Sequence, residues 1–197
     1  MELIFITTLI ISYLIGAIPC GVVLTRLTGA GDVRNSGSGN IGATNVYRTA
    51  GRKLGILTLV GDIIKGVIPV VYAIAVADMT VEQTAMIACA TFLGHLYPVY
   101  LGFKGGKGVA TALGIYLVLS PLSVLFAAIL FISLVWIWRY VSLGSIMSAA
   151  AIPVLIYFLE SSTPLLFASL FISTMVIWRH RENIGRLLSG TENKFKA

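Results

Sequence analysis

Three polar segments of an otherwise apolar chain carry the residue types that bind anions. The first, residues 35–48, reads NSGSGNIGATNVYR and holds three glycines, two serines and three asparagines. Glycine lets the backbone approach a ligand closely, so N–H groups and small hydroxyls can point at an anion. If residues 43–48 are helical, Asn45 and Arg48 share a face. The alternative is a flexible Gly/Ser connector, which would need neither the asparagines nor the arginine.

The second segment, residues 102–111, reads GFKGGKGVAT and precedes an apolar run. Its glycines would expose N–H groups at a helix N-terminus, where the helix dipole favours a bound phosphate, and Lys104 and Lys107 add positive charge. The spacing of an ATP-binding P-loop is absent because Gly108 follows Lys107, so the segment does not favour an ATPase. A tight turn with two interfacial lysines is the simpler alternative.

The third segment, residues 178–194, is rich in basic and amide side chains. Arg179, Asn183 and Arg186 recur at helical spacing, and His180 lies three positions before Asn183, so the latter two could point into one site. A basic tail that only anchors the chain at the membrane surface is the alternative. The three segments together predict a cationic pocket that binds phosphate groups.

The elements that must position these segments are membrane helices. The chain is 57% hydrophobic and 11% charged, whereas soluble proteins carry about 25% charged residues. We therefore expect an all-α membrane protein, a single domain over residues 1–197, with seven transmembrane helices. The candidate spans are residues 3–25, 54–77, 84–103, 108–120, 122–138, 142–159 and 164–178.

The least obvious of these boundaries lies within residues 108–138. One helix over this stretch would be about 46 Å long, well beyond a hydrocarbon core of roughly 30 Å. Pro121 suits the first turn of a new helix, so we divide the stretch at Ser120-Pro121.

Charge placement supports the seven-span arrangement. The side opposite the N-terminus receives thirteen of the fourteen basic residues, namely Arg26, Arg34, Arg48, Arg52, Lys53, Lys104, Lys107, Arg139, Arg179, Arg181, Arg186, Lys194 and Lys196. The other side receives only acidic residues: Glu2, Asp78, Glu82 and Glu160. The positive-inside rule then places the N-terminus outside and the C-terminus in the cytoplasm. All three polar segments consequently face the cytoplasm.

A few reactive side chains lie within the apolar runs. Asp62 and Lys65 are three positions apart, which allows either a self-neutralising pair or a functional role. His95 is expected to be a hydrogen-bonded helix residue. Cys20 and Cys89 are expected to be buried thiols, with no disulfide and no metal site.

Several function classes are disfavoured. The basic residues border spans and accompany no nucleic-acid motif, so no nucleic-acid partner is expected. A metal-dependent phosphotransferase would need clustered carboxylates, and no metal or cofactor is expected. A transporter or channel for a phosphorylated metabolite stays open as the alternative, although no inverted repeat is visible and the basic clusters lie on one side only.

In this order the three segments resemble the signature of the bacterial acyl-phosphate:glycerol-3-phosphate acyltransferases. The matching stretches are residues 36–48, 94–111 and 179–186, and the resemblance extends over nearly the whole chain. It implies transfer of a fatty acyl group from acyl phosphate to the 1-hydroxyl of glycerol 3-phosphate, giving lysophosphatidic acid and inorganic phosphate in the first step of phospholipid synthesis. It also implies a monomer among the lipids of the bacterial inner membrane, with a cytoplasmic active site.

The resemblance assigns roles by position. It implies catalytic roles for Ser38, Arg48, Lys107, His180 and Asn183. It implies substrate-binding roles for Asn40, Thr44, Asn45, Lys104, Gly105, Gly106 and Gly108. The glycine segment with Ser38 and Asn40 would hold the acyl phosphate, and Arg48 with Lys104, Thr44 and Asn45 would grip glycerol 3-phosphate. His180 and Asn183 would orient substrate or donate to an oxyanion.

The general base stays open between two groups. His180 is the protein candidate by its intrinsic pKa, and a phosphate oxygen of a substrate is the other. We favour the substrate phosphate, because acyl phosphate is already activated and positioning could suffice. The motif of acyl-CoA-dependent enzymes, an aspartate five positions after a histidine, is absent, since Tyr100 and Gly185 occupy those positions.

Overall fold

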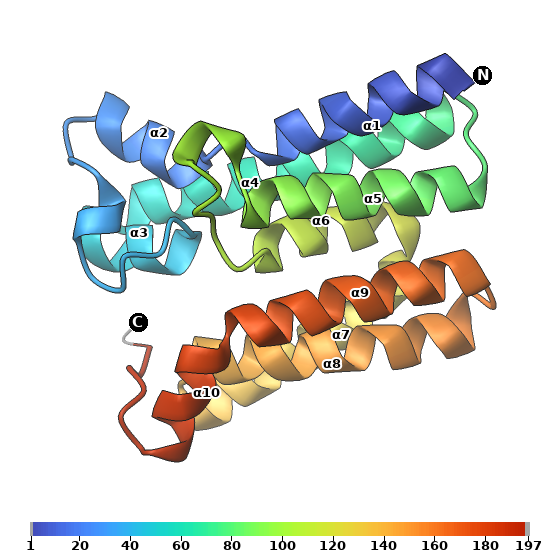
Figure 1. Cartoon of the computed structure of the whole chain (residues 1–197). Helices are drawn as coiled ribbons and strands as arrows, with labels where there is room; N and C mark the ends of the chain where they lie inside the picture. The colour runs from blue at the N-terminus through green and yellow to red at the C-terminus, as the bar shows by residue number, and fades with distance from the viewer. Residues whose placement is uncertain (1, 196–197) are drawn as a thin grey trace. The chain divides into compact units, whose positions relative to one another are not determined.

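The computed structural model describes residues 2–195, and within that range every regular element is a helix, as predicted. Lys196, one of the predicted surface cations, lies outside the described residues. The chain divides into two compact units, Met1–Val118 and Leu119–Ala197. Each unit is described by itself below, and Figure 1 shows the helices of both.

The first unit carries long apolar helices and the two glycine-rich segments. Its α-helices are α1 (Glu2–Gly16), α2 (Cys20–Leu27), α3 (Ala43–Ala50), α4 (Arg52–Ala75), α5 (Val81–Leu96) and α6 (Val109–Leu119). Two short 3₁₀ turns accompany them, η1 (Val33–Asn35) and η2 (Val99–Leu101). Helix α1 lies along α5, and α4 contacts α1, α3 and α5 (Figure 1).

Close contact between α1 and α5 depends on glycines. A methyl group at Gly16 would collide with the backbone of Thr91, and one at Gly94 would collide with the backbone of Tyr13. The two helices therefore approach backbone to backbone, an arrangement common between membrane helices. This contact fixes the end of α5 from which the second polar segment departs.

The first apolar run, predicted as one span over residues 3–25, forms two helices that meet at a bend of 47°. The break falls at Pro19, which precedes α2. Proline lacks an N–H group and disfavours helical geometry in the residue before it, so it interrupts the helix. The run is thus a broken span or a re-entrant segment rather than one straight helix.

The second unit is built from α7 (Pro121–Trp138), α8 (Val141–Leu159), α9 (Thr163–Arg179) and α10 (Arg181–Leu188). Helix α8 lies between α7 and α9, and the short α10 contacts both α8 and α9. The predicted division of the long apolar stretch is confirmed, because α6 ends at Leu119 and α7 begins at Pro121. Buried Ser120 precedes the proline and donates a hydrogen bond to Glu160 (2.6 Å).

The lengths of the apolar helices identify a protein that spans a membrane several times. Helices α4, α7 and α8, and the segment Val81–Leu101 containing α5, are long and apolar enough to cross, and the bent α1–α2 pair is a fifth candidate. Helices α6 and α9, with 11 and 17 residues, fall short of the usual span of about 20 residues. Seven crossings therefore remain a prediction.

Candidate active site

The first polar segment folds into a loop that ends in α3, so residues 43–48 are helical. The amide side chain of Asn45, 3% exposed, holds this loop together. Its oxygen accepts a hydrogen bond from the N–H of Ser38 (2.9 Å). Its nitrogen lies 2.9–3.2 Å from three loop carbonyls, those of Val33, Ser36 and Asn40. The loop backbone thus occupies the Asn45 amide, which gives this residue a positioning role.

The same loop presents its other polar groups at its surface. Gly37 and Gly39 have positive φ angles of 60° and 68°, which permit the tight path around Ser38. The side chain of Asn40 accepts from the N–H of Gly42 (2.8 Å) at the start of α3. Ser38 and Arg48 are exposed, and Thr44 is half-buried. A small apolar cluster fixes the loop and α3 on α2: Val22, Val33, Ile41 and Val46.

Asp32, at the edge of this loop, is engaged by two arginines. Its carboxylate forms ion pairs with Arg34 (2.6 Å) and Arg26 (2.7 Å). Hydrogen bonds from Arg34 and then Arg26 hold the pKa of Asp32 well below its usual range, and Asp32 in turn raises the pKa of Arg34. The carboxylate therefore orders two arginines and takes up no proton near neutral pH.

The second polar segment packs onto the C-terminal end of α5. The N–H of Gly105 donates to the carbonyl of Leu96 (3.1 Å), and the N–H of Gly106 donates to that of His95 (3.2 Å). The expectation that these two N–H groups point at an anion is therefore wrong for this structure, because the end of α5 supplies acceptors for them. A methyl group at Gly106 would collide with the ring of His95, so only glycine fits there.

After these two glycines the segment leads directly into α6. Gly108, with a φ of 85°, turns the chain so that α6 begins at Val109. Lys107 is half-buried beside this turn, whereas Lys104 is exposed. The cationic groups at this helix N-terminus are thus one sheltered lysine and one at the surface.

Three buried ionisable side chains connect the glycine segment to the helix break at Pro19. The ammonium group of Lys65 lies 2.8 Å from the carboxylate of Asp62 and donates to the carbonyl of Ile18 (2.7 Å). The ring of His95 lies 3.8 Å from the same carboxylate. All three side chains are at most 5% exposed. The ion pair that the spacing of Asp62 and Lys65 allows is formed, and it also joins α4 to the α1–α2 bend.

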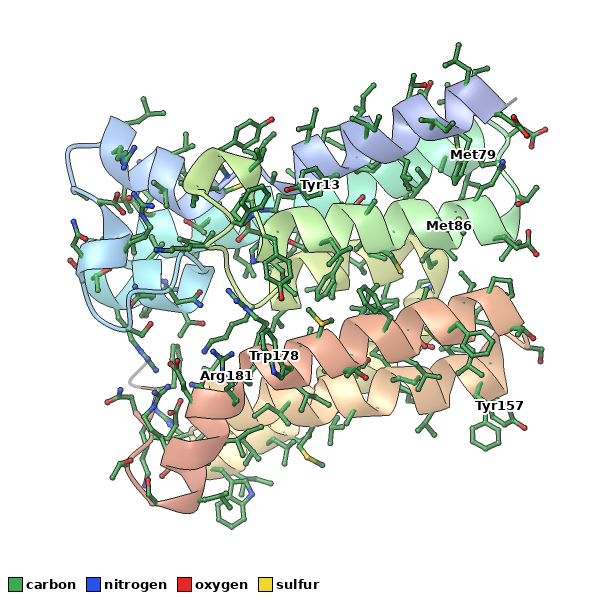
Figure 2. The ribbon with its side chains drawn as sticks, viewed as in Figure 1. Tyr13, Met79, Met86, Tyr157, Trp178 and Arg181 are labelled. Carbon is green, nitrogen blue, oxygen red and sulfur yellow. The ribbon has the colours of Figure 1, made fainter. Side chains whose placement is uncertain are left out.

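The third polar segment supplies a histidine with a defined tautomer. His180 is buried at the junction of α9 and α10, and its Nδ1 lies 2.8 Å from the carbonyl oxygen of Val176. A carbonyl oxygen only accepts hydrogen bonds, so Nδ1 carries the proton and Nε2 holds the lone pair of the neutral ring. Just beyond it, Arg181 lies over the ring of Trp178 (4.7 Å to the centroid), as Figure 2 shows.

Asn183, one turn into α10, donates a hydrogen bond to Glu192 (2.7 Å). The same carboxylate accepts from Arg186 (2.7 Å) and from Ser142 (2.9 Å). Burial alone would raise the pKa of Glu192, but the hydrogen bonds from Arg186, Asn183 and Ser142 outweigh it and the pKa lies below its usual range. Sequence reasoning missed both Glu192 and Ser142, because neither belongs to a helical repeat with Asn183.

The structure thus forms two groups of predicted site residues, one in each unit. The first unit carries Ser38, Asn40, Thr44, Asn45 and Arg48 on one loop and helix, and it carries Lys104 to Gly108 in the segment that packs onto the end of α5. The second unit brings together His180 and Asn183. A single site that uses both groups stays a prediction.

Comparison with known proteins identifies the kind of molecule that carries these segments. The family model for glycerol-3-phosphate acyltransferase matches residues 6–190. A glycerol-3-phosphate acyltransferase of Syntrophotalea carbinolica is 65% identical, with 98% of each chain covered, and one of Geobacter sulfurreducens is 54% identical, with 95% covered. The chain belongs to the glycerol-3-phosphate acyltransferase family. The resemblance seen in the sequence is thereby confirmed.

Solved structures agree with this family assignment. The glycerol 3-phosphate form of PlsY, an integral membrane glycerol 3-phosphate acyltransferase, has a TM-score of 0.92 and 41% identity, covering 98% of this chain and 96% of that one. Its lysophosphatidic acid form has a TM-score of 0.90 and 40% identity, with 98% and 95% covered. The acyltransferase family and the integral membrane location of this chain rest on these matches and on its apolar helices.

Proposed function

We propose that this protein transfers a fatty acyl group from acyl phosphate to the 1-hydroxyl of glycerol 3-phosphate. The hydroxyl oxygen forms an ester bond to the acyl carbon while the bond from that carbon to phosphate breaks, and the hydroxyl proton leaves with the phosphate. Lysophosphatidic acid and inorganic phosphate result. The observation that carries the proposal is the near full-length likeness to a glycerol 3-phosphate acyltransferase solved in glycerol 3-phosphate and lysophosphatidic acid forms.

Acyl phosphate as the donor is supported by the absence of an acyl-CoA motif and by the presence of two cationic segments. The chain has no aspartate five positions after either histidine, the motif expected of an acyl-CoA-dependent enzyme. Two phosphate-bearing substrates would account for two separate cationic segments, that of Arg48 and that of Lys107. An acyl phosphate is an activated mixed anhydride, so charge stabilisation and positioning supply much of the catalysis.

The roles of individual groups follow from their placement. Lys107, sheltered at the N-terminus of α6, is assigned to the phosphate of the donor, where a cation and the helix dipole both favour a leaving anion. Exposed Arg48 on α3 is assigned to the phosphate of glycerol 3-phosphate, which a guanidinium can grip through two hydrogen bonds. Asn45 and Asn40 shape the loop that carries Ser38.

For the proton of the glycerol hydroxyl we favour a substrate phosphate as acceptor, with His180 as an orienting group. The Nδ1–H of His180 donates to the carbonyl of Val176, so a hydrogen bond from the substrate hydroxyl would have to be accepted at Nε2. His180→Gln separates the two versions by its turnover. A loss of about 100-fold or more fits a histidine base, whereas loss of less than about tenfold excludes it.

The experiment that tests the function is phosphate release by the purified protein in lipid, given palmitoyl phosphate with and without glycerol 3-phosphate. We expect release only when glycerol 3-phosphate is present, and its disappearance in Lys107→Ala. Binding of glycerol 3-phosphate without any release would overturn the proposal. It would favour the transporter, and a flux assay in vesicles would then decide.

A further inference from the structure

The last described residues of the chain do more than follow the final helix. Residues 191–195, here called the C-terminal strap, return to the start of α8. The backbone N–H of Phe195 donates to the carbonyl of Arg139 (2.6 Å), and the Arg139 side chain donates to the carbonyl of Phe195 (3.3 Å). Lys194 lies over the ring of Tyr140 (5.9 Å to the centroid). These contacts attach the segment that follows α10 to the residues that precede α8.

Glu192 is the inward-facing residue of this strap. Its side chain is 5% exposed, which is rare for a carboxylate unless hydrogen bonds compensate for burial. Compensation comes from two elements at once, since Ser142 on α8 and Asn183 on α10 both donate to Oε1 while Arg186 donates to Oε2. Three hydrogen bonds, from side chains on two helices, therefore hold the carboxylate in place.

The contact with Asn183 has a directional consequence. An ionised carboxylate only accepts hydrogen bonds, so the NH₂ end of the Asn183 amide must face Glu192 and the carbonyl end must face away from it. Asn183 itself is 6% exposed, so solvent does not provide a substitute for Glu192.

We propose that Glu192 is a positioning residue of the active site, whose carboxylate fixes the side chain of Asn183 in the orientation that glycerol 3-phosphate requires. The inference rests on the proposed function and on the role that the resemblance implies for Asn183, contact with the substrate. Glu192 touches no substrate; it acts through Asn183. This role would explain why the strongly hydrogen-bonded Glu192 follows the basic residues of α10.

A double-mutant cycle tests whether Glu192 acts through Asn183. The variants are Glu192→Gln, Asn183→Ala and the double variant, and Glu82→Gln, an exposed carboxylate with the same change, is the matched control. We expect Glu192→Gln to lower kcat/KM for glycerol 3-phosphate by about tenfold or more while the KM for acyl phosphate changes by less than about twofold. In the Asn183→Ala background the same change should have less than about a twofold effect.

Other outcomes are equally decisive. Equal losses from Glu192→Gln in both backgrounds would show that the strap stabilises the fold without orienting Asn183, and the proposal would be wrong. If Asn183→Ala has no measurable turnover, the cycle is read from the dissociation constant of glycerol 3-phosphate by calorimetry, with the same expectations. Absence of turnover in the unmodified protein would instead count against the proposed function, and the calorimetric cycle would still decide the role of Glu192.

Discussion

At the scale of single residues, the polar groups of this protein divide into those that shape a segment and those that can reach a ligand. The side chains of Asn45 and Glu192 are buried and hydrogen-bonded to their neighbours. Ser38 and Arg48, in contrast, are exposed on the loop and helix that Asn45 organises. Substitutions in the two classes should consequently differ, with stability affected in the first class and activity alone in the second.

The first prediction concerns Asn45→Asp. The change replaces an NH₂ group that faces three carbonyls with a carboxylate oxygen, so repulsion replaces hydrogen bonds at a buried position. We expect a loss of about 3 kcal/mol in the free energy of unfolding, together with loss of acyl transfer. Thermal unfolding in detergent measures the first quantity. Asn35→Asp, the same change at an exposed position, should alter the midpoint little, and equal effects would refute the role given to Asn45.

The second prediction concerns pH and Glu192. Its pKa is lower in the folded protein than the ordinary value of 4.5, so its ionisation stabilises the fold above that pH. The contribution should fall as the pH drops below 4.5 toward the pKa of the folded protein. We expect the difference in unfolding temperature between the unmodified protein and Glu192→Gln to be constant above about pH 6 and to shrink below about pH 4.5. A difference that persists unchanged to about pH 3 would argue against this assignment.

At the scale of helices, the segments are held by contacts that cross from one helix to another. Lys65 on α4 bonds to the carbonyl of Ile18 at the bend between α1 and α2, and His95 on α5 lies against Gly106 of the glycine segment. Lys65 is thereby linked to the glycine segment through Asp62 and His95. Substitutions of Asp62 or Lys65 in α4 should therefore alter the position of Lys107.

A prediction at this scale is that Lys65→Met destabilises the first unit strongly. It leaves the carboxylate of Asp62 buried without its cation, which costs about 3–5 kcal/mol in comparable buried pairs. The double variant Asp62→Asn/Lys65→Met removes both charges and should recover more than half of that loss. Thermal unfolding of the three variants gives the comparison. A double variant no more stable than Lys65→Met would mean that the contact with Ile18, rather than the charge pair, dominates.

The sequence predicted helices better than it predicted their contacts. Pro121 located the start of α7 because proline suits the first turn of a helix. Residues 43–48 are helical in α3, but Asn45 is buried there and Arg48 is exposed. The engaged N–H groups of Gly105 and Gly106 were not predictable, because their acceptors belong to another segment. The burial of Glu192 was missed for the same reason, since α8 supplies one of its donors.

At the scale of the whole molecule, the distribution of charge argues for a fixed orientation in the membrane. Thirteen of the fourteen basic residues fall on one side in the seven-span arrangement, including Arg181 and Arg186 of α10. Fewer crossings would place part of this charge on the other side, which the positive-inside rule disfavours. The two short helices α6 and α9 are the crossings that need a direct test.

The corresponding prediction uses single cysteines placed after Cys20 and Cys89 are replaced by alanine. Ser161→Cys, in the exposed turn between α8 and α9, should react with a membrane-impermeant maleimide added to spheroplasts, because the seven-span arrangement places this turn outside. Ser189→Cys, exposed after α10, should react only when the membrane is opened. Labelling of Ser189→Cys in intact spheroplasts would exclude the seven-span topology.

The pairing of Asp62 with Lys65 also bears on how the chain enters the membrane. Because the two lie three positions apart on α4, they can neutralise each other within one helix before any other helix is present. A lone charge at a helix centre costs about 2.5–3.5 kcal/mol on insertion. A neutral pair therefore lowers the free energy needed to move α4 from the translocon into lipid. Once α4 has been released beside the first two helices, the same ammonium group can reach Ile18, 47 residues earlier in the chain. The bend of the N-terminal segment would then be completed late in biogenesis, by a residue whose charge was already compensated during insertion.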